Sequence, residues 1–224
     1  MQGFDVDVAI AVGKDLGVET CFVTPNWDNI TAGSWAGEWD VSIESMAITN
    51  TRKEVLDFSI PYSYTLAVFA VDADSSFESI DDLASQVICA GTSTIYESWL
   101  NQEDIDLPAS SIYSQPPADI VVFTLDSDQE CAQALAAGRR DFVAYLTSQT
   151  VLNANIDAGF PVKQLGPPVF SEALAPAYDK SSTLPTDSLR AAVDDTITRM
   201  QNDGTLTTLS IKWFNEDITI SPIQ

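Results

Sequence analysis

The stretch from Glu38 to Tyr62, EWDVSIESMAITNTRKEVLDFSIPY, constrains the fold of this 224-residue chain more than any other. Apolar and polar side chains alternate from Val41 to Ser45, which predicts a buried strand. Small residues follow, and Thr49 or Asn50 can cap a short helix that carries Arg52 in its first turn. The stretch therefore predicts a strand, a tight turn and a helix, with one arginine close to the end of the strand.

Arg52 is the only arginine among the first 138 residues. Its planar guanidinium group can hold a carboxylate through two parallel hydrogen bonds. Taken by itself, an arginine such as Arg52 would more often lie at the surface or in an ion pair. The pattern of the surrounding residues favours the binding role.

That pattern resembles the signature of family 3 extracellular solute-binding proteins, the amino-acid-type receptors of ABC importers. The resemblance continues in the same order along nearly all of the chain, in GFDVDVAIAVGKDLG (3–17), NWDNI (26–30), AGTSTIYESWL (90–100) and NDGTLTTLSIKWF (202–214). It implies an α/β, two-lobed fold of the type II periplasmic-binding-protein kind, in which each lobe is a mixed sheet flanked by helices. Lobe 1 would combine residues 1–65 and 172–224, lobe 2 would be 66–171, and hinge crossings would lie near 62–66 and 170–174.

In the family a strand precedes the first helix and lies in the middle of the first sheet. The loop after that strand carries an acidic residue and an aromatic residue that touch the ligand. Here the sequence starts at Met1, directly before the predicted helix from Gly3 to Gly17, so we expect lobe 1 to lack its first strand. Either the sequence is a fragment or mis-started, or the domain closes its sheet differently.

Periodicity and capping signals place the other elements. Helices are predicted at 28–35, 79–83, 128–137, 147–158, 188–202 and 206–214, with one more that opens at 91–94 and carries Tyr96 and Trp99. Strands are predicted at 19–24, 63–71, 86–90, 120–125, 141–145, 162–165 and 175–178, and a rigid turn at 166–168. The run 63–71 should leave the first lobe and enter the second.

The resemblance also implies a set of ligand-binding residues in the cleft. Arg52 would fix a ligand carboxylate together with Thr92 and Ser93, whose Gly-Thr-Ser-Thr turn at a helix start offers free N–H groups and hydroxyls to an anion. The same turn could simply cap its helix through Thr92 or Thr94. Ser45 would offer backbone or hydroxyl contacts, Ala47 would let the backbone approach the ligand, Trp27 would cover it, and Tyr145 and Thr147 would line the far wall. Trp27 could instead pack the domain, as Trp35 and Trp39 could.

The chain departs from the family at Leu146, where the family keeps an aspartate that pairs with the ligand's α-ammonium group. A buried ammonium group facing leucine would lose a hydrogen bond worth about 1.5–3 kcal/mol. Glu44 stands where the family usually keeps a small residue. One hypothesis is that Glu44 answers a cationic group of the ligand under Trp27; the alternative is a salt-bridged or solvated glutamate at a strand end.

The composition excludes several classes of function. Asp and Glu number 33 against 10 Lys and Arg, for a net charge of −23, which excludes nucleic acid as a partner and argues against an anionic membrane surface. The charge fits a salty or acidic habitat as well as an ordinary acidic exported protein. With no histidine, the usual general base, the Ser-His nucleophile and most zinc sites are removed.

The three cysteines, Cys21, Cys89 and Cys131, are far apart and have no metal-ligand spacing. Cys21 and Cys89 each lie in apolar, strand-like runs. All three are predicted to be buried as small hydrophobic side chains.

The function implied is reversible capture of a small carboxylated, amino-acid-like solute and its delivery to an ABC-type permease, without bond chemistry, metal or cofactor. We expect a monomer in the periplasm or outside the cell, peripheral to the membrane only through the permease or a lost lipid anchor. One alternative is an enzyme like the cyclohexadienyl dehydratases, with Glu44 or Glu172 as the acid or base. The other is a ligand-sensing module of a receptor.

Overall fold

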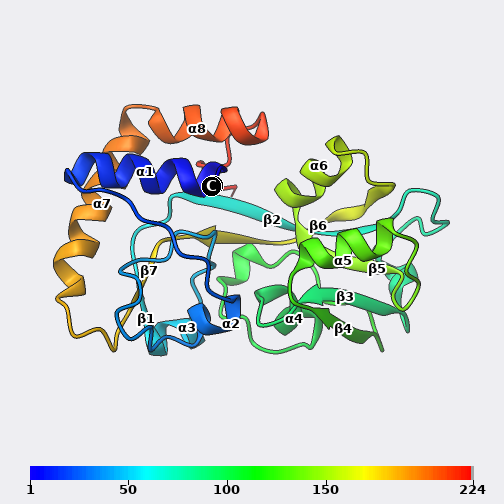
Figure 1. Ribbon diagram of the computed structural model, residues 1–224. Helices are drawn as coiled ribbons and strands as arrows, with labels where there is room; N and C mark the ends of the chain where they lie inside the picture. The colour runs from blue at the N-terminus through cyan, green and yellow to red at the C-terminus, as the bar shows by residue number, and fades with distance from the viewer. Residues whose placement is uncertain (223–224) are drawn as a thin grey trace. The chain divides into compact units, whose positions relative to one another are not determined.

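The computed structural model describes residues 1–222, which divide into two compact units (Figure 1). Unit 1 comprises residues 1–64 together with the described part of 173–224, and unit 2 comprises 65–172. Within the described residues, no helix is long and apolar enough to span a bilayer.

Three helices form the larger core of unit 1: α1 (Phe4–Leu16), α7 (Thr186–Asn202) and α8 (Thr205–Phe214). Figure 1 shows α1 and α8 side by side, and both also contact α7. The helix α1 ends as predicted, because Gly17 adopts φ 67° and its N–H caps the carbonyls of Gly13 and Lys14. The side chains that these helices bury together are Phe4, Val8, Val12, Val193, Ile197, Met200 and Leu206, with Trp213 and Phe214 partly buried against them.

The paired strands of unit 1 are β1 (Leu56–Phe58) and β7 (Ala177–Asp179), which run antiparallel. Residues 42–48 extend this pair only through the isolated bridges Ser42–Ala177 and Ala47–Leu174. The bridges are five residues apart on one side and three on the other, so the chain bulges between them, and Ser45 at φ 54° lies in the bulge. The continuous strand predicted from Val41 to Ser45 was therefore wrong.

Two further predictions for unit 1 were wrong. The helix expected from Asp28 to Trp35 is the shorter α2 (Trp27–Thr31), because Gly33 and Ser34 adopt left-handed conformations at φ 68° and 60°. The strand expected at 19–24 does not form, since no strand of residues 1–222 pairs with it. This segment leaves Phe22 and Val23 exposed.

Asp179, at the end of β7, anchors the left-handed loop that follows α2. Its carboxylate accepts hydrogen bonds from the backbone N–H groups of Ser34 (3.2 Å), Trp35 (2.7 Å) and Ser181 (2.8 Å). Burial pushes the pKa of Asp179 upward, but the hydrogen bonds outweigh burial and hold this pKa below its usual range. The ionised carboxylate therefore stabilises the fold at neutral pH, and this contribution is lost as the pH falls through the lowered pKa.

We expect Asp179→Asn to lower the free energy of unfolding by about 1–3 kcal/mol at pH 7, because an amide oxygen accepts these hydrogen bonds more weakly than a carboxylate. Urea unfolding followed by tryptophan fluorescence measures the change. Asp187→Asn is the matched control, since the Asp187 side chain is 85% exposed. A variant at Asp179 as stable as this control would contradict the anchoring role.

Unit 2 is built on a five-stranded mixed sheet with the order β4-β3-β5-β2-β6. The strand β3 runs parallel to β4 and β5, and β2 runs antiparallel to β5. Its strands are β2 (Ser63–Asp72), β3 (Val87–Gly91), β4 (Val121–Leu125), β5 (Ala144–Ser148) and β6 (Val162–Leu174). The predicted turn at 166–168 lies inside β6, an edge strand, where prolines such as Pro167 and Pro168 are tolerated better than in a central strand.

Helices cover both faces of this sheet. On one face, α5 (Asp128–Ala136) and α6 (Gln149–Asp157) pack on a core that includes Val68, Tyr145 and Leu152. On the other, α4 (Ile95–Leu100) places the Trp99 ring 6.0 Å from that of Phe69. The remaining elements are the short 3₁₀ helices η1 (Ile80–Leu83) and η2 (Ala109–Ser111), and in unit 1 the helix α3 (Asn50–Val55).

The prediction that all three cysteines are buried is confirmed for Cys89 and Cys131 and was wrong for Cys21. Cys89 on β3 and Cys131 on α5 form a disulfide inside the core of unit 2, and Cys21 in unit 1 is a free, exposed cysteine. Spacing along the chain could not reveal the pair, because 42 residues separate its members and only the packing of α5 on β3 brings them together.

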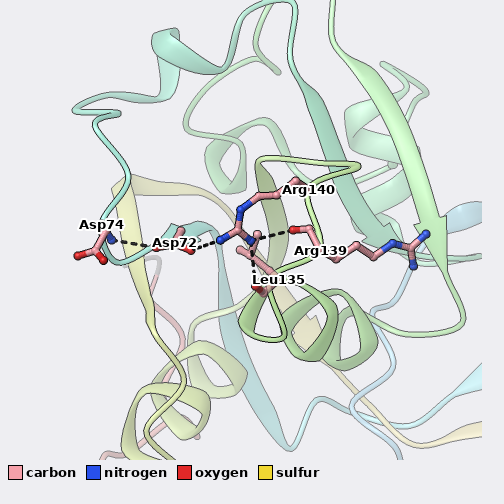
Figure 2. A network of polar contacts seen from close by, with 5 residues as sticks. All are labelled: Asp72, Asp74, Leu135, Arg139 and Arg140. Carbon is pink, nitrogen blue, oxygen red and sulfur yellow. Dashed lines mark hydrogen bonds and ion pairs between the residues drawn. The ribbon is translucent and has the colours of Figure 1, made fainter.

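A second, exposed link joins the end of β2 to the end of α5 (Figure 2). Arg140 donates to the Asp72 carboxylate at 3.1 Å and to the backbone carbonyl groups of Leu135 and Arg139. Asp72 in turn accepts from the backbone N–H of Asp74. Because the Arg140 side chain is 60% exposed, the ion pair contributes at most about 1 kcal/mol.

Candidate functional site

Arg52 is held at the start of α3 by its own backbone and by its side chain. Thr49 caps the helix, as one of the two predicted candidates, by accepting the N–H of Arg52 at 3.1 Å. The guanidinium group folds back and donates to the carbonyl of Ala47 at 3.0 Å, and its Cζ lies 5.3 Å from the centre of the Trp27 ring. Arg52 is buried at 8% exposure, so its charge has little access to bulk water. Three predicted site residues, Arg52, Trp27 and Ala47, therefore meet in unit 1.

Ser45 lies in the bulge before Ala47, in an exposed position and with φ 54°. Its N–H donates to the phenol oxygen of Tyr62 at 2.9 Å, and its hydroxyl donates to the carboxylate of Asp5 at 3.0 Å. The Tyr62 hydroxyl donates to the other Asp5 oxygen at 2.7 Å. We call these three residues the Asp5–Tyr62–Ser45 network.

Asp5 and Tyr62 were not among the predicted site residues. Asp5 lies in the first turn of α1, where an acidic residue interacts favourably with the helix dipole, and this position alone accounts for an aspartate. The available signal was that both residues lie in stretches that carry the family resemblance. Neither stretch shows that the two side chains meet.

The network shifts the acidity of its members. Burial raises the pKa of Asp5 to about 6, although the hydrogen bonds from Tyr62 and Ser45 oppose the shift. Burial and the neighbouring Asp5 charge raise the pKa of Tyr62 well above its usual value, so its phenol remains protonated.

Glu44 is exposed and accepts a hydrogen bond from the Ser42 hydroxyl at 3.1 Å. Partial burial of the carboxyl group raises its pKa, the Ser42 hydroxyl lowers it, and the charge of Asp5 raises it further. The negative charges of Glu44 and Asp5 therefore repel each other near the Ser45 bulge. This region of unit 1 is electronegative.

In unit 2, the backbone N–H groups of the turn at 91–94 already donate hydrogen bonds to other residues of the same unit. The N–H of Thr92 donates to the carbonyl of Leu125 at 2.8 Å. The N–H of Ser93 donates to the carboxylate of Glu97 at 2.7 Å. Thr94 caps α4 by accepting the N–H of Glu97 at 3.2 Å. The expectation of free N–H groups at this turn was wrong, because Leu125 and Glu97 of the same unit already accept the N–H groups of Thr92 and Ser93.

Gly91 sets the position of this turn. A Cβ atom at Gly91 would lie 2.9 Å from the backbone nitrogen of Asp128, so only glycine lets the start of α5 approach the end of β3 this closely. The carboxylate of Asp128 accepts a hydrogen bond from the hydroxyl of Thr147. Burial raises the pKa of Asp128, against the hydrogen bonds from Thr147 and from the N–H of Gln129.

The predicted far wall is not a surface. Tyr145 is fully buried in the core beneath α5 and α6, and Thr147 is fully buried against Asp128. Leu146 is also fully buried, opposite Phe69 in the sheet, so it is a core residue. The prediction failed because β5 ends at Ser148, three residues later than expected, so the strand keeps all three side chains inside the domain.

A buried acid that sequence analysis named only for the enzyme alternative lies elsewhere in unit 2. Glu172 accepts the hydroxyl of Tyr96 at 2.7 Å, and both side chains are buried, at 4% and 8% exposure. Burial and the charges of Glu172 and Asp128 raise the pKa of Tyr96 well above its usual value. Among residues 1–222, no group of three or more acidic or cysteine side chains is arranged to hold a metal ion.

The family model for bacterial extracellular solute-binding proteins, family 3, matches residues 1–216. The chain belongs to this family. The family 3 chain is 31% identical over 222 residues to the probable amino-acid-binding protein YxeM of Bacillus subtilis (strain 168), covering 98% of this chain and 78% of YxeM. It is 30% identical over 223 residues to the L-cystine-binding protein TcyJ of Escherichia coli (strain K12), covering 98% and 76%.

Solved structures share the fold of this family 3 protein. An ancestral arginine-binding protein bound to arginine matches with a TM-score of 0.78 and 29% identity, over 95% of this chain and 88% of that chain. The ancestral amino acid-binding protein AncCDT-1, a precursor of cyclohexadienyl dehydratase, matches with a TM-score of 0.78 and 27% identity, over 95% and 86%. The predicted family and the two-lobed α/β fold class are confirmed.

Proposed function

We propose that this family 3 solute-binding protein captures a small carboxylated, amino-acid-like solute and delivers it to an ABC-type permease. The observation that carries the proposal is the buried Arg52 guanidinium group against the Trp27 ring. The planar donors of a guanidinium group match the two oxygens of a carboxylate, and the aromatic ring beside them can cover the body of a ligand. The ligand's carboxylate binds Arg52, and its body lies against Trp27.

The ligand class follows from the relatives. YxeM is named as a probable amino-acid-binding protein and TcyJ as an L-cystine-binding protein, and the ancestral protein was solved with arginine. All three names imply a ligand with an α-carboxylate and an α-ammonium group. In this chain Ser45 contributes a polar contact, Ala47 a close backbone approach and Glu44 negative charge.

The lobe boundaries and the hinge crossings near 62–66 and 170–174 stay as predicted from the sequence. The protein works in the periplasm or outside the cell, in keeping with the Cys89–Cys131 disulfide, because disulfides persist in oxidising compartments.

No bond is made or broken in this proposal. The buried Glu172–Tyr96 pair is the observation that favours the enzyme alternative, since a buried carboxyl group can act as an acid or base. Against it, AncCDT-1 is itself described as an amino acid-binding protein. Turnover of prephenate by the purified chain would establish the enzyme, whereas saturable binding without turnover supports the receptor.

The direct test is a thermal-shift screen of the standard amino acids, L-cystine, betaines and small carboxylates. We expect at least one α-amino acid to stabilise the protein by about 2.7 kcal/mol at a hundredfold excess over its dissociation constant. Isothermal titration calorimetry then gives the affinity and stoichiometry. If no amino acid shifts the unfolding transition at millimolar concentration, the proposal fails.

A further inference from the structure

The Asp5–Tyr62–Ser45 network fixes the direction of two hydrogen bonds. An ionised carboxylate can only accept, so the hydroxyl protons of Tyr62 and Ser45 both point at Asp5, over 2.7 Å and 3.0 Å. The Tyr62 oxygen also accepts the N–H of Ser45 at 2.9 Å. Two hydrogen bonds therefore hold Ser45 in its left-handed conformation at φ 54°.

This direction determines what Ser45 can offer to a ligand. A serine hydroxyl has one proton and two lone pairs. When the Ser45 hydroxyl donates its hydrogen bond to Asp5, the exposed Ser45 oxygen has only lone pairs to offer a ligand and can act only as an acceptor. It then attracts an ammonium or amide N–H group and repels a carboxylate.

We propose that Asp5 is a specificity-determining residue, which fixes Ser45 as a hydrogen-bond acceptor so that this bulge selects the α-ammonium group of the ligand. The inference rests on the proposed function, because it assumes that an amino-acid-like ligand reaches Ser45. The inference places the ligand's ammonium group in unit 1, at the Ser45 bulge. This bulge precedes Ala47, whose carbonyl accepts a hydrogen bond from Arg52.

The charges around Asp5 also favour an ammonium group over a carboxylate at Ser45. Glu44 lies close enough for the charge of Asp5 to raise its pKa, so two carboxyl groups flank Ser45. From α8, the Lys212 ammonium group pairs with Asp7 at 2.6 Å. From the strand side, the group that faces Asp5 is the neutral phenol of Tyr62.

Protonation of Asp5 would reverse this selection. With a pKa of about 6, Asp5 is ionised at pH 8 and mostly neutral at pH 5. A neutral carboxyl group can donate its own proton to Ser45, and it no longer contributes negative charge. Affinity for an ammonium-bearing ligand should therefore fall as the pH drops through 6.

The experiment compares ligands with and without the α-amino group. L-arginine is paired with 5-guanidinopentanoate, and L-glutamine with 4-carbamoylbutanoate, by calorimetry at pH 8 and pH 5. Wild type should bind the amino acid of at least one pair about 10-fold or more tightly than its des-amino partner at pH 8, and this preference should shrink at pH 5.

Asp5→Asn should lose about 10-fold or more in affinity for the amino acid and little for the des-amino partner. Because the amide N–H₂ can donate to Ser45, the preference should also depend less on pH between 5 and 8 than in wild type. Ser45→Ala, which leaves Asp5 in place, should show the same selective loss. Asp15→Asn is the matched control, since Asp15 is a carboxylate on the same helix that accepts the Thr196 hydroxyl at 2.6 Å.

The outcomes separate the inference from the proposed function. If wild type binds none of the four compounds, the proposed function fails for these ligands and the inference falls with it. If wild type binds, but Asp5→Asn weakens both members of a pair equally or keeps the wild-type pH profile, the inference alone is overturned. Circular dichroism of each variant shows whether a loss reflects misfolding.

Discussion

Replacing Arg52 by alanine is expected to lower the affinity for an amino-acid ligand by about 100-fold, because the ligand carboxylate loses its charged hydrogen-bond donors. Calorimetry with L-arginine, L-glutamine and L-cystine measures the loss. The truncation also frees the carbonyl of Ala47, which accepts from Arg52 at 3.0 Å, so a moderate loss of stability should accompany it.

The ligand itself provides the control for Arg52. L-argininamide and L-glutamine amide lack the carboxylate, so wild type should bind them about as weakly as Arg52→Ala binds the free acids. Arg52→Ala should bind acid and amide alike. Arg52→Lys keeps the charge but loses the planar pair of donors, and we expect an intermediate affinity. Lys53→Ala, at an exposed neighbouring position, should leave binding unchanged. If the acid keeps its advantage in Arg52→Ala, the carboxylate binds elsewhere.

Removal of the Cys89–Cys131 disulfide has the largest expected effect on stability. The bond closes a loop whose ends are 42 residues apart, which corresponds to about 4 kcal/mol of lost chain entropy in the unfolded state. Cys89→Ala with Cys131→Ala should therefore lower the free energy of unfolding of unit 2 by about this amount, and treatment of wild type with a thiol reductant should act similarly. Urea unfolding followed by circular dichroism measures both.

Cys21→Ser is the control for the disulfide, because the Cys21 side chain is free and exposed. We expect it to change the free energy of unfolding by no more than about 0.5 kcal/mol. A double variant at Cys89 and Cys131 that is as stable as this control would show that the bond contributes nothing to the native fold. Free-thiol counting in denaturant, before and after reduction, checks that the bond is present in the purified protein.

The sequence predicted well the elements that carry their own local signals. Helix α1 ends at a glycine, α7 and α8 have strong apolar stripes, and β2 is a long apolar run. The failures are strands that depend on a partner. Residues 19–24 have the composition of a strand but lack a neighbour among the described residues, and residues 41–45 are interrupted by the Ser45 bulge. Strand propensity does not report whether another strand lies alongside.

The candidate site divides in the same way. The cluster of Arg52, Trp27 and Ala47 was expected, because those residues lie in stretches with a clear family pattern. The Asp5–Tyr62–Ser45 network was not, since Asp5 and Tyr62 are 57 positions apart and meet only when α1 packs. Tyr145 and Thr147 were misplaced by a shift of three residues in β5, which no local signal of the sequence determined.

Glu97 has a consequence for ligands that bear phosphate or sulfate. Its carboxylate, which receives the N–H of Ser93 at 2.7 Å, is a tethered competitor on the same short helix. A free anion would have to displace a group whose effective concentration is at least millimolar. A free phosphate or sulfate would therefore compete at the Ser93 N–H with a carboxylate that cannot diffuse away.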